Sequence, residues 1–138
     1  MNKSVAVITA AMILSASYIS QTFAAVRDSD ICGKWVLDSE RNSDIIDELY
    51  LQYGSSLRHY GAELFVGDGK LSYYIGLSGG EGTYTRADGV ITADIVSYNG
   101  GRESTERFYE MTENGEIYLL YRAGTEPENL DIIWRKSD

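Results

Sequence analysis

The sequence is poor in the residue types that cross-link or constrain a fold. Its 138 residues contain one cysteine and one proline. A single cysteine cannot form an internal disulfide, so a disulfide scaffold is excluded and the core has to hold without cross-links. Cys32 is then either a buried residue at the start of a strand or a free thiol that could link two chains. Pro127 lies in the connection before the last expected strand, where its missing N–H costs nothing.

Histidine is equally scarce, which limits the chemistry that the chain can perform. The only histidine, His59, lies near Ser55 and Ser56, but closeness in sequence does not create the geometry of a nucleophile and its base. One histidine and one cysteine cannot supply the usual zinc ligands, and no acidic run matches a calcium loop. The carboxylates along single segments do not face each other across a cleft, as glycosidases require. We therefore predict no enzyme, no metal site and no cofactor.

Basic residues are in the minority. The chain has 12 Lys and Arg against 21 Asp and Glu, a net charge of −9. An acidic surface of this size argues against binding of nucleic acid and of anionic membranes or wall polymers, because both require lysine and arginine. We predict no nucleic-acid partner, although acidity alone also serves to keep a secreted protein soluble.

Long apolar runs are absent apart from one at the N-terminus. Val5 to Ile19 follows the positive Lys3 and is too short for a comfortable membrane span, and Thr22-Phe23-Ala24 ends in a small residue. We interpret residues 1–24 as a secretory signal peptide that is cleaved near Ala24, and we predict a secreted protein without membrane insertion. Removing 24 of the 138 residues leaves 114, which suits one domain with a modest core, and loss of Lys3 makes the charge −10.

Turn residues, in contrast, recur about every ten positions. Glycines with neighbouring Asn or Asp supply the positive φ of tight hairpins at 67–69, 79–80, 88–89, 99–101 and 114–115. The segments between them are rich in Tyr, Ile, Val, Leu and Thr, which favour strands. We predict eight strands, at Gly33 to Ser39, Tyr60 to Val66, Lys70 to Leu77, Glu81 to Arg86, Val90 to Ser97, Ser104 to Met111, Glu116 to Arg122 and Leu130 to Lys136.

Alternating apolar and polar residues give most of these strands one side that faces a core. Leu71, Tyr73 and Ile75 share one face of the third strand, and Leu77 is expected to continue it. Closure of eight sequential strands removes both exposed edges. We predict an all-β, eight-stranded antiparallel up-and-down barrel, with a two-sheet sandwich as the alternative. The expected interior residues are Trp35, Leu64, Leu71, Tyr73, Ile75, Ile91, Ile95, Phe108, Leu120, Ile132 and Trp134.

One segment departs from the strand pattern. In SDIIDELYLQYGSSL the apolar residues Ile45, Ile46, Leu49 and Tyr53 fall near helical spacing, Ser43 can cap the start and Gly54 can end the segment. We predict a short helix, Asp44 to Tyr53, between the first two strands. Its apolar face has to be buried, and the open mouth of the barrel is a natural place for it.

Short motifs at both ends of the mature chain resemble those of a known family. The opening GKW, Gly33-Lys34-Trp35, resembles the Gly-x-Trp start of lipocalins and related calycin barrels, and the closing DIIWRKSD resembles their last strand with its basic residue. The stretch GKLSYYIGLSGGEGTYTRADGVITADI is similar to small secreted lipocalin-like domains of Gram-positive bacteria. The resemblance implies that Trp35 plugs one end of the barrel, that Gly33 allows close packing there, and that Arg135 or Lys136 stacks on the indole.

Tyrosine is the one residue type in excess, with ten of the eleven in the mature chain. Inward tyrosines could line a pocket for a hydrophobic or sugar-like ligand, outward ones could bind a partner, and all of them suit strands as such. If one mouth is plugged, the ligand site lies at the other, under the helix. We name as site residues Tyr50, Tyr53, Tyr73, Tyr84 and Tyr118.

The function predicted from these features is a non-catalytic, lipocalin-like binding module. Its partner would be a small apolar or amphipathic ligand or a protein, and the chain is expected to be a monomer, with a Cys32-linked dimer as the exception. The alternative is a structural or inhibitory envelope protein with a filled barrel, and a hydrolase is the least favoured reading.

Overall fold

The fold is that of a closed β-barrel in a computed structural model that describes residues 26–123 and 129–137. The predicted signal peptide and Pro127 lie outside the described residues. The elements are, in order, α1 (Asp28–Ile31), β1 (Gly33–Leu37), η1 (Ser43–Ile45), α2 (Ile46–Tyr53), α3 (Ser55–Tyr60), β2 (Ala62–Gly67), β3 (Lys70–Ile75), β4 (Ser78–Ala87), β5 (Val90–Ser97), β6 (Glu103–Glu113), β7 (Glu116–Ala123) and β8 (Leu130–Lys136). Each strand pairs antiparallel with the next, and β8 pairs with β1, so the predicted eight-stranded up-and-down barrel is confirmed.

Closure of the barrel depends on a side chain as well as on the two strands. The β1–β8 ladder pairs Trp35 with Lys136 and Leu37 with Trp134. Beyond β1, the amide of Asn42 replaces the missing strand: its Nδ2 donates to the carbonyl of Ile133 at 2.8 Å, and its Oδ1 accepts from the N–H of Ile133 at 2.9 Å. Asn42 is almost fully buried. The seam therefore continues past the end of β1 with every backbone group of Ile133 paired.

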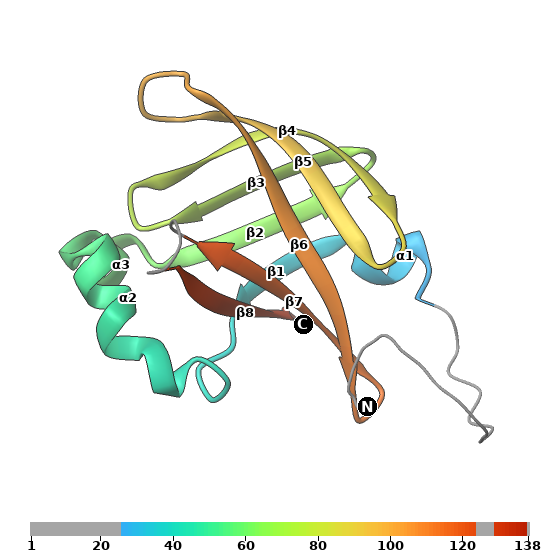
Figure 1. Cartoon of the computed structure of the whole chain (residues 1–138), viewed down its shortest axis with the longest axis horizontal. Helices are drawn as coiled ribbons and strands as arrows, with labels where there is room; N and C mark the ends of the chain where they lie inside the picture. Colours follow the sequence, from blue (N-terminus) through green and yellow to red (C-terminus); the bar gives the residue numbers. More distant parts are fainter. Residues whose placement is uncertain (1–25, 124–128, 138) are drawn as a thin grey trace.

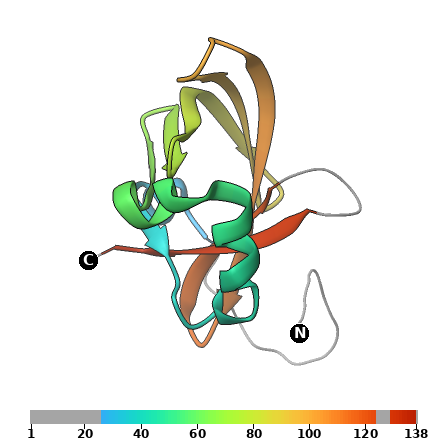
Figure 2. The same cartoon turned by 90° about the vertical axis from the view of Figure 1, so that its left-hand side faces the viewer.

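The helices lie at the two ends of the barrel. Figures 1 and 2 show α1 at one end, beside the β4–β5 turn, and α2 and α3 together at the opposite end. We call these the α1 end and the α2/α3 end. Leu49 of α2 and Leu57 of α3 belong to the buried core, so both helices pack on the barrel interior. Among the described residues no helix is both long and apolar enough to cross a membrane.

The connection between β1 and β2 holds more helix than the single short one predicted. The segment Asp44 to Tyr53 is helical as η1 and α2, and Gly54, with φ +70°, ends α2. A second helix, α3, follows directly, so β2 begins at Ala62 and not at Tyr60. The four-residue α1 was not predicted either. Helices this short give little periodic signal in a sequence.

The turn predicted at Gly79 and Gly80 is wrong. The β3–β4 hairpin turns at Gly76 and Leu77, whereas Gly79 and Gly80 belong to β4. Gly76 has φ +62°, and a Cβ there would lie 2.3 Å from Oγ of Ser56. Because the strand ends at Ile75, Leu77 is exposed and does not continue the inner face. Gly79 of β4 instead allows close approach of β3, and Gly80 and Gly82 allow close approach of β5.

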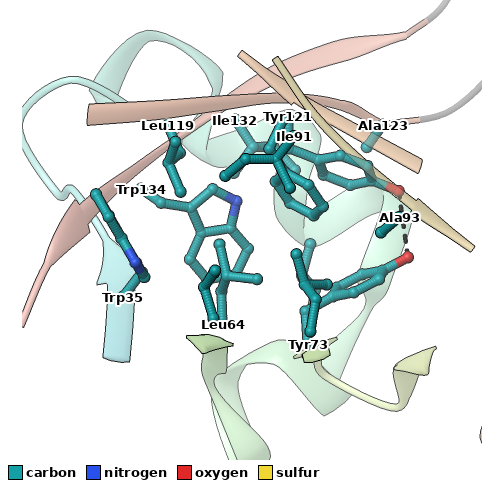
Figure 3. Packing of buried hydrophobic residues seen from close by; sticks show 14 of the residues in the cluster. Trp35, Leu64, Tyr73, Ile91, Ala93, Leu119, Tyr121, Ala123, Ile132 and Trp134 are labelled. Atoms are coloured by element: carbon teal, nitrogen blue, oxygen red, sulfur yellow. Dashed lines mark hydrogen bonds between the residues drawn. The ribbon is translucent and has the colours of Figure 1, made fainter. Parts of the chain in front are cut away.

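The interior is filled by large apolar side chains (Figure 3). Both tryptophans and Phe108 are fully buried, and ten of the eleven predicted core residues are buried. The exception is Leu120, because the pairing of Leu119 with Trp134 points Leu119 inward and Leu120 outward. Residues 117–121 are apolar on both faces, so the sequence carries no alternation there from which to choose.

Candidate functional site at the helix-covered end

The structure brings together two of the five tyrosines predicted as site residues. Tyr53 of α2 and Tyr73 of β3 lie near each other at the α2/α3 end, where Gly76 after β3 meets Ser56 of α3. Tyr50 lies on the same helix as Tyr53, with its ring under the guanidinium of Arg58 at 4.7 Å. Tyr84 is next to the Cys32 thiol, and Tyr118 is on the outer wall under Arg41 at 4.0 Å. The five do not form one site.

Polar side chains that were not predicted complete a cluster around Tyr53 and Tyr73. The hydroxyl of Tyr121 lies 3.4 Å from that of Tyr73 and donates to Oε1 of Glu106 at 3.0 Å. Ser104 donates to Oε2 of the same carboxylate at 2.8 Å. We call Tyr53, Tyr73, Ser104, Glu106 and Tyr121 the mouth cluster. It offers one carboxylate and four hydroxyl groups at the end of the barrel.

Strand register places these groups on the inner wall. Glu106 pairs with the buried Ala93, and Phe108, two residues along β6, is fully buried, so Glu106 faces inward. Tyr121 pairs with Ile132, another buried residue. This signal was present in the sequence, because Ser104, Glu106 and Phe108 share one strand face. It was missed because these carboxylates were considered only as a pair across a cleft, and not by which of them shares a face with Phe108.

Large aromatic side chains occupy the interior next to the mouth cluster. Phe108 stacks on Tyr121 with ring centroids 5.0 Å apart and meets Tyr73 edge to face at 5.9 Å. Figure 3 shows the two tryptophans on the far side of these rings, while the hydroxyls of Tyr73 and Tyr121 point away from them, toward Ala93. A ligand of this site would be held at the mouth and not deep in the barrel.

Burial changes the acidity of the phenols in the mouth cluster. Burial, with Tyr73 and Glu106 nearby, raises the pKa of Tyr53 to about 12 from its ordinary 10.0. Burial also raises the pKa of Tyr73 and of Tyr121, and the negative charge of Glu106 acts in the same direction on both. A phenolate is disfavoured in a dry site beside a carboxylate, so all three hydroxyls stay protonated as hydrogen-bond donors at neutral pH.

We expect alkaline pH to destabilise the protein through these tyrosines. The fold holds the neutral phenol, so this contribution to the free energy of unfolding is complete below the ordinary pKa of 10.0 and is lost as the pH rises through about 12. Unfolding midpoints measured across this range, with phenolate absorbance of folded and denatured protein, test the expectation. In the Tyr121→Phe variant, the free energy of unfolding should fall less steeply with rising pH than in the wild type. Identical titration curves for folded and denatured protein would contradict it.

The predicted plug residues lie at the α1 end, where the helix itself contributes the closure. Trp35 is fully buried, and its indole N–H donates to the carbonyl of Ile31 in α1 at 2.9 Å. Arg135 is exposed and pairs with Val36 on the outer face. Among the described residues the cation–π contacts involve Arg41 and Arg58, so neither Arg135 nor Lys136 stacks on Trp35. Lys136 instead donates to the carbonyl of Asp30 at 2.8 Å. Its side chain also passes close to Gly33, where a Cβ would lie only 3.0 Å from Cε of Lys136.

An ion pair also closes the α1 end from inside. Arg86 of β4 binds Glu110 of β6 through two hydrogen bonds, Nε to Oε2 at 2.6 Å and a terminal nitrogen to Oε1 at 3.0 Å. The same guanidinium reaches Asp28 at 2.8 Å and the carbonyl of Val26 at 2.6 Å. The bonds to Glu110, above all, and to Asp28 raise the pKa of Arg86. The pair therefore fastens the N-terminal segment to the barrel wall.

Two hollows lie outside the interior. One, of about 500 Å³, lies along α3 beside His59 and Leu77. The other, of about 980 Å³, is an open groove over the outer faces of β1 to β5. Lys34, Phe65, Ser72, Glu81 and Val96 form one row across its floor.

The structure also places the remaining candidates for catalytic and metal-binding chemistry. His59 is exposed and its ring contacts the edge of Tyr60. Cys32 is a half-buried free thiol. The part of the chain that the structure describes contains no group of three His, Cys, Asp or Glu that could hold a metal ion. No family model, curated protein or solved structure matches the chain.

Proposed function

We propose that the protein is a secreted, non-catalytic binding module that holds a small amphipathic ligand at the α2/α3 end of the barrel. The observation that carries the proposal is the mouth cluster, a carboxylate and four hydroxyls between the buried apolar core and two short helices. Ligand sites typically combine mostly apolar walls with a few oriented polar groups. The lipocalin-like barrel that the sequence resembles is compatible with this use.

The surroundings of the cluster suit a ligand with an apolar part. Tyr53 is partly buried against the core, and the rings of Tyr73 and Tyr121 are buried while their hydroxyls reach the cluster. Ser104 is exposed, so the cluster is open to solvent at this edge. The polar group of a ligand would enter there, and its apolar part would lie against α2 and the tyrosine rings.

Blocking this edge tests the proposal. Ser104 faces inward at the edge of the cluster, and its neighbour Thr105 faces outward, bonding to Asp94 at 3.4 Å. We expect the neutral hydrophobic dye Nile red to bind the wild type with enhanced fluorescence, Ser104→Trp to weaken binding about tenfold or more, and Thr105→Trp to leave it unchanged. A wild type that binds no dye, or equal effects of both variants, would refute ligand binding at this site and favour a filled barrel.

A protein partner is the second candidate function, and the outer groove favours it. Phe65, Val96 and Tyr98 are large apolar side chains that line the groove and are about half exposed. Apolar side chains collected in a groove often mark a protein-binding surface. The double variant Phe65→Ser, Val96→Ser changes this surface and leaves the mouth cluster intact. A protein retained from the native culture medium by wild type and Ser104→Trp, but not by the double variant, would support this candidate.

A further inference from the structure

Two carboxylates face the interior of the barrel from the same strand, and they differ in their partners. Glu106 and Glu110 are four residues apart on β6, with the fully buried Phe108 between them on the same face. Inward carboxylates are unusual in a barrel, since an unpaired charge away from water costs free energy.

Glu110 is neutralised within the protein. Its carboxylate binds the guanidinium of Arg86 in a two-pronged pair, and both side chains are largely buried. This is the geometry in which an arginine compensates a buried carboxylate most effectively. The charge of Glu110 therefore needs no external partner.

Glu106 has hydroxyl partners in place of a cation. It accepts from Tyr121 and Ser104, and among the ion pairs of the described residues none includes Glu106. Neutral donors orient a carboxylate but do not cancel its charge. The α2/α3 end is thus left with a half-buried negative charge at the position where the proposed ligand would lie.

The direction of the hydrogen bonds shows which ligand group would fit. Tyr121 has one hydroxyl proton, which it donates to Glu106, so the bond between the two phenols requires Tyr73 as the donor. Among the hydrogen-bonded residues Tyr73, Tyr121, Ser104 and Glu106, each hydroxyl proton points toward the carboxylate, and the oxygens that remain are acceptors. An ammonium group carries donors only, so it complements the cluster in both charge and hydrogen bonding.

We infer that the mouth cluster binds the ammonium head of an amphipathic amine, with Glu106 as its counter-ion. This inference rests on the proposed function. An anionic head would meet the charge of Glu106, and a neutral alcohol would gain hydrogen bonds without charge compensation. The apolar tail of the amine would lie against α2 and the tyrosine rings, as proposed for the ligand in general.

Three amphiphiles of equal chain length test this inference by calorimetry below their micellar concentrations at neutral pH: n-decylamine, 1-decanol and decanoate. We expect the amine to bind about tenfold or more tightly than the alcohol, and decanoate to bind least. Glu106→Gln should reduce amine affinity about tenfold more than it reduces alcohol affinity, because only the amine loses its counter-ion. The matched control is Glu103→Gln, which removes an exposed charge from the outer face of the same strand.

The outcomes separate the two proposals. If the alcohol binds and Ser104→Trp abolishes that binding, but the amine has no advantage, the proposed function stands and the cation inference is wrong. Equal effects of Glu103→Gln and Glu106→Gln would also overturn it, because they would indicate attraction by the acidic surface as a whole. If none of the three binds, the proposed function fails together with the inference. An unfolding midpoint for Glu106→Gln confirms that the variant is folded.

Discussion

Replacing Trp35 with alanine is expected to lower the free energy of unfolding by about 3–5 kcal/mol, a large part of the stability of a domain of this size. The indole is fully buried, belongs to the hydrophobic core and holds α1 through its bond to Ile31. Denaturant unfolding followed by circular dichroism measures the loss. A variant with the midpoint of the wild type would show that Trp35 does not hold the α1 end together.

The second tryptophan provides a matched comparison. Trp134 is equally buried, but its indole nitrogen has no hydrogen-bond partner among the described residues. Trp35→Phe and Trp134→Phe remove similar volumes, yet the first also leaves the carbonyl of Ile31 without its donor. We expect Trp35→Phe to cost about 1–2 kcal/mol more than Trp134→Phe. Equal costs would mean that volume alone, and not the bond to α1, determines the contribution of Trp35.

Arg86→Met is expected to destabilise the protein to a similar extent, by about 3–5 kcal/mol, because it leaves Glu110 as an uncompensated buried charge. The side chain of Glu110 is only 6% exposed. Asp28→Asn is the control, since that carboxylate is 83% exposed and its bond to Arg86 should contribute less than about 1 kcal/mol. Thermal unfolding of both variants measures the difference.

A double variant separates charge from packing at the same place. Arg86→Met combined with Glu110→Leu removes both charges and fills the space with apolar groups, so stability should recover most of the loss. Recovery would show that the cost of the single variant comes from the stranded carboxylate. If the double variant is as unstable as Arg86→Met, the hydrogen bonds of Arg86 to α1 and Val26 carry the effect.

The sequence was sufficient for the strands because their signals are local. Hairpin turns such as Asp88-Gly89 have positive φ at both residues, as the sequence predicts, and they fix the register of the strands beside them. It was insufficient where both faces of a strand are apolar, as at Leu119 and Leu120. The short helices α1 and α3 are stabilised mainly by burial of Ile31 and Leu57, which no local pattern reveals.

The candidate site was predictable only in part for the same reason. Placing a helix over one mouth followed from its apolar face, and this brought Tyr53 near Tyr73. Which tyrosines face inward depends on strand parity, and Tyr118 was assigned to the site although its strand position points outward. Glu106 could have been found from parity with Phe108. Glu110 has Arg86 as a basic partner, whereas Glu106 has none among the described ion pairs. This difference depends on contacts between strands that are far apart in sequence.

Because β1 pairs with β8, the first strand cannot complete its pairing until the last strand has folded. Trp35 and Lys136 are partners across nearly the whole described chain. Contacts of such separation form late and slowly, since the loop between them has to close first. Until β8 is in place, β1 and β7 each present a free edge that can pair with another molecule. A nascent or truncated chain without β8 is thus expected to aggregate, whereas the intact barrel has no edge left to offer.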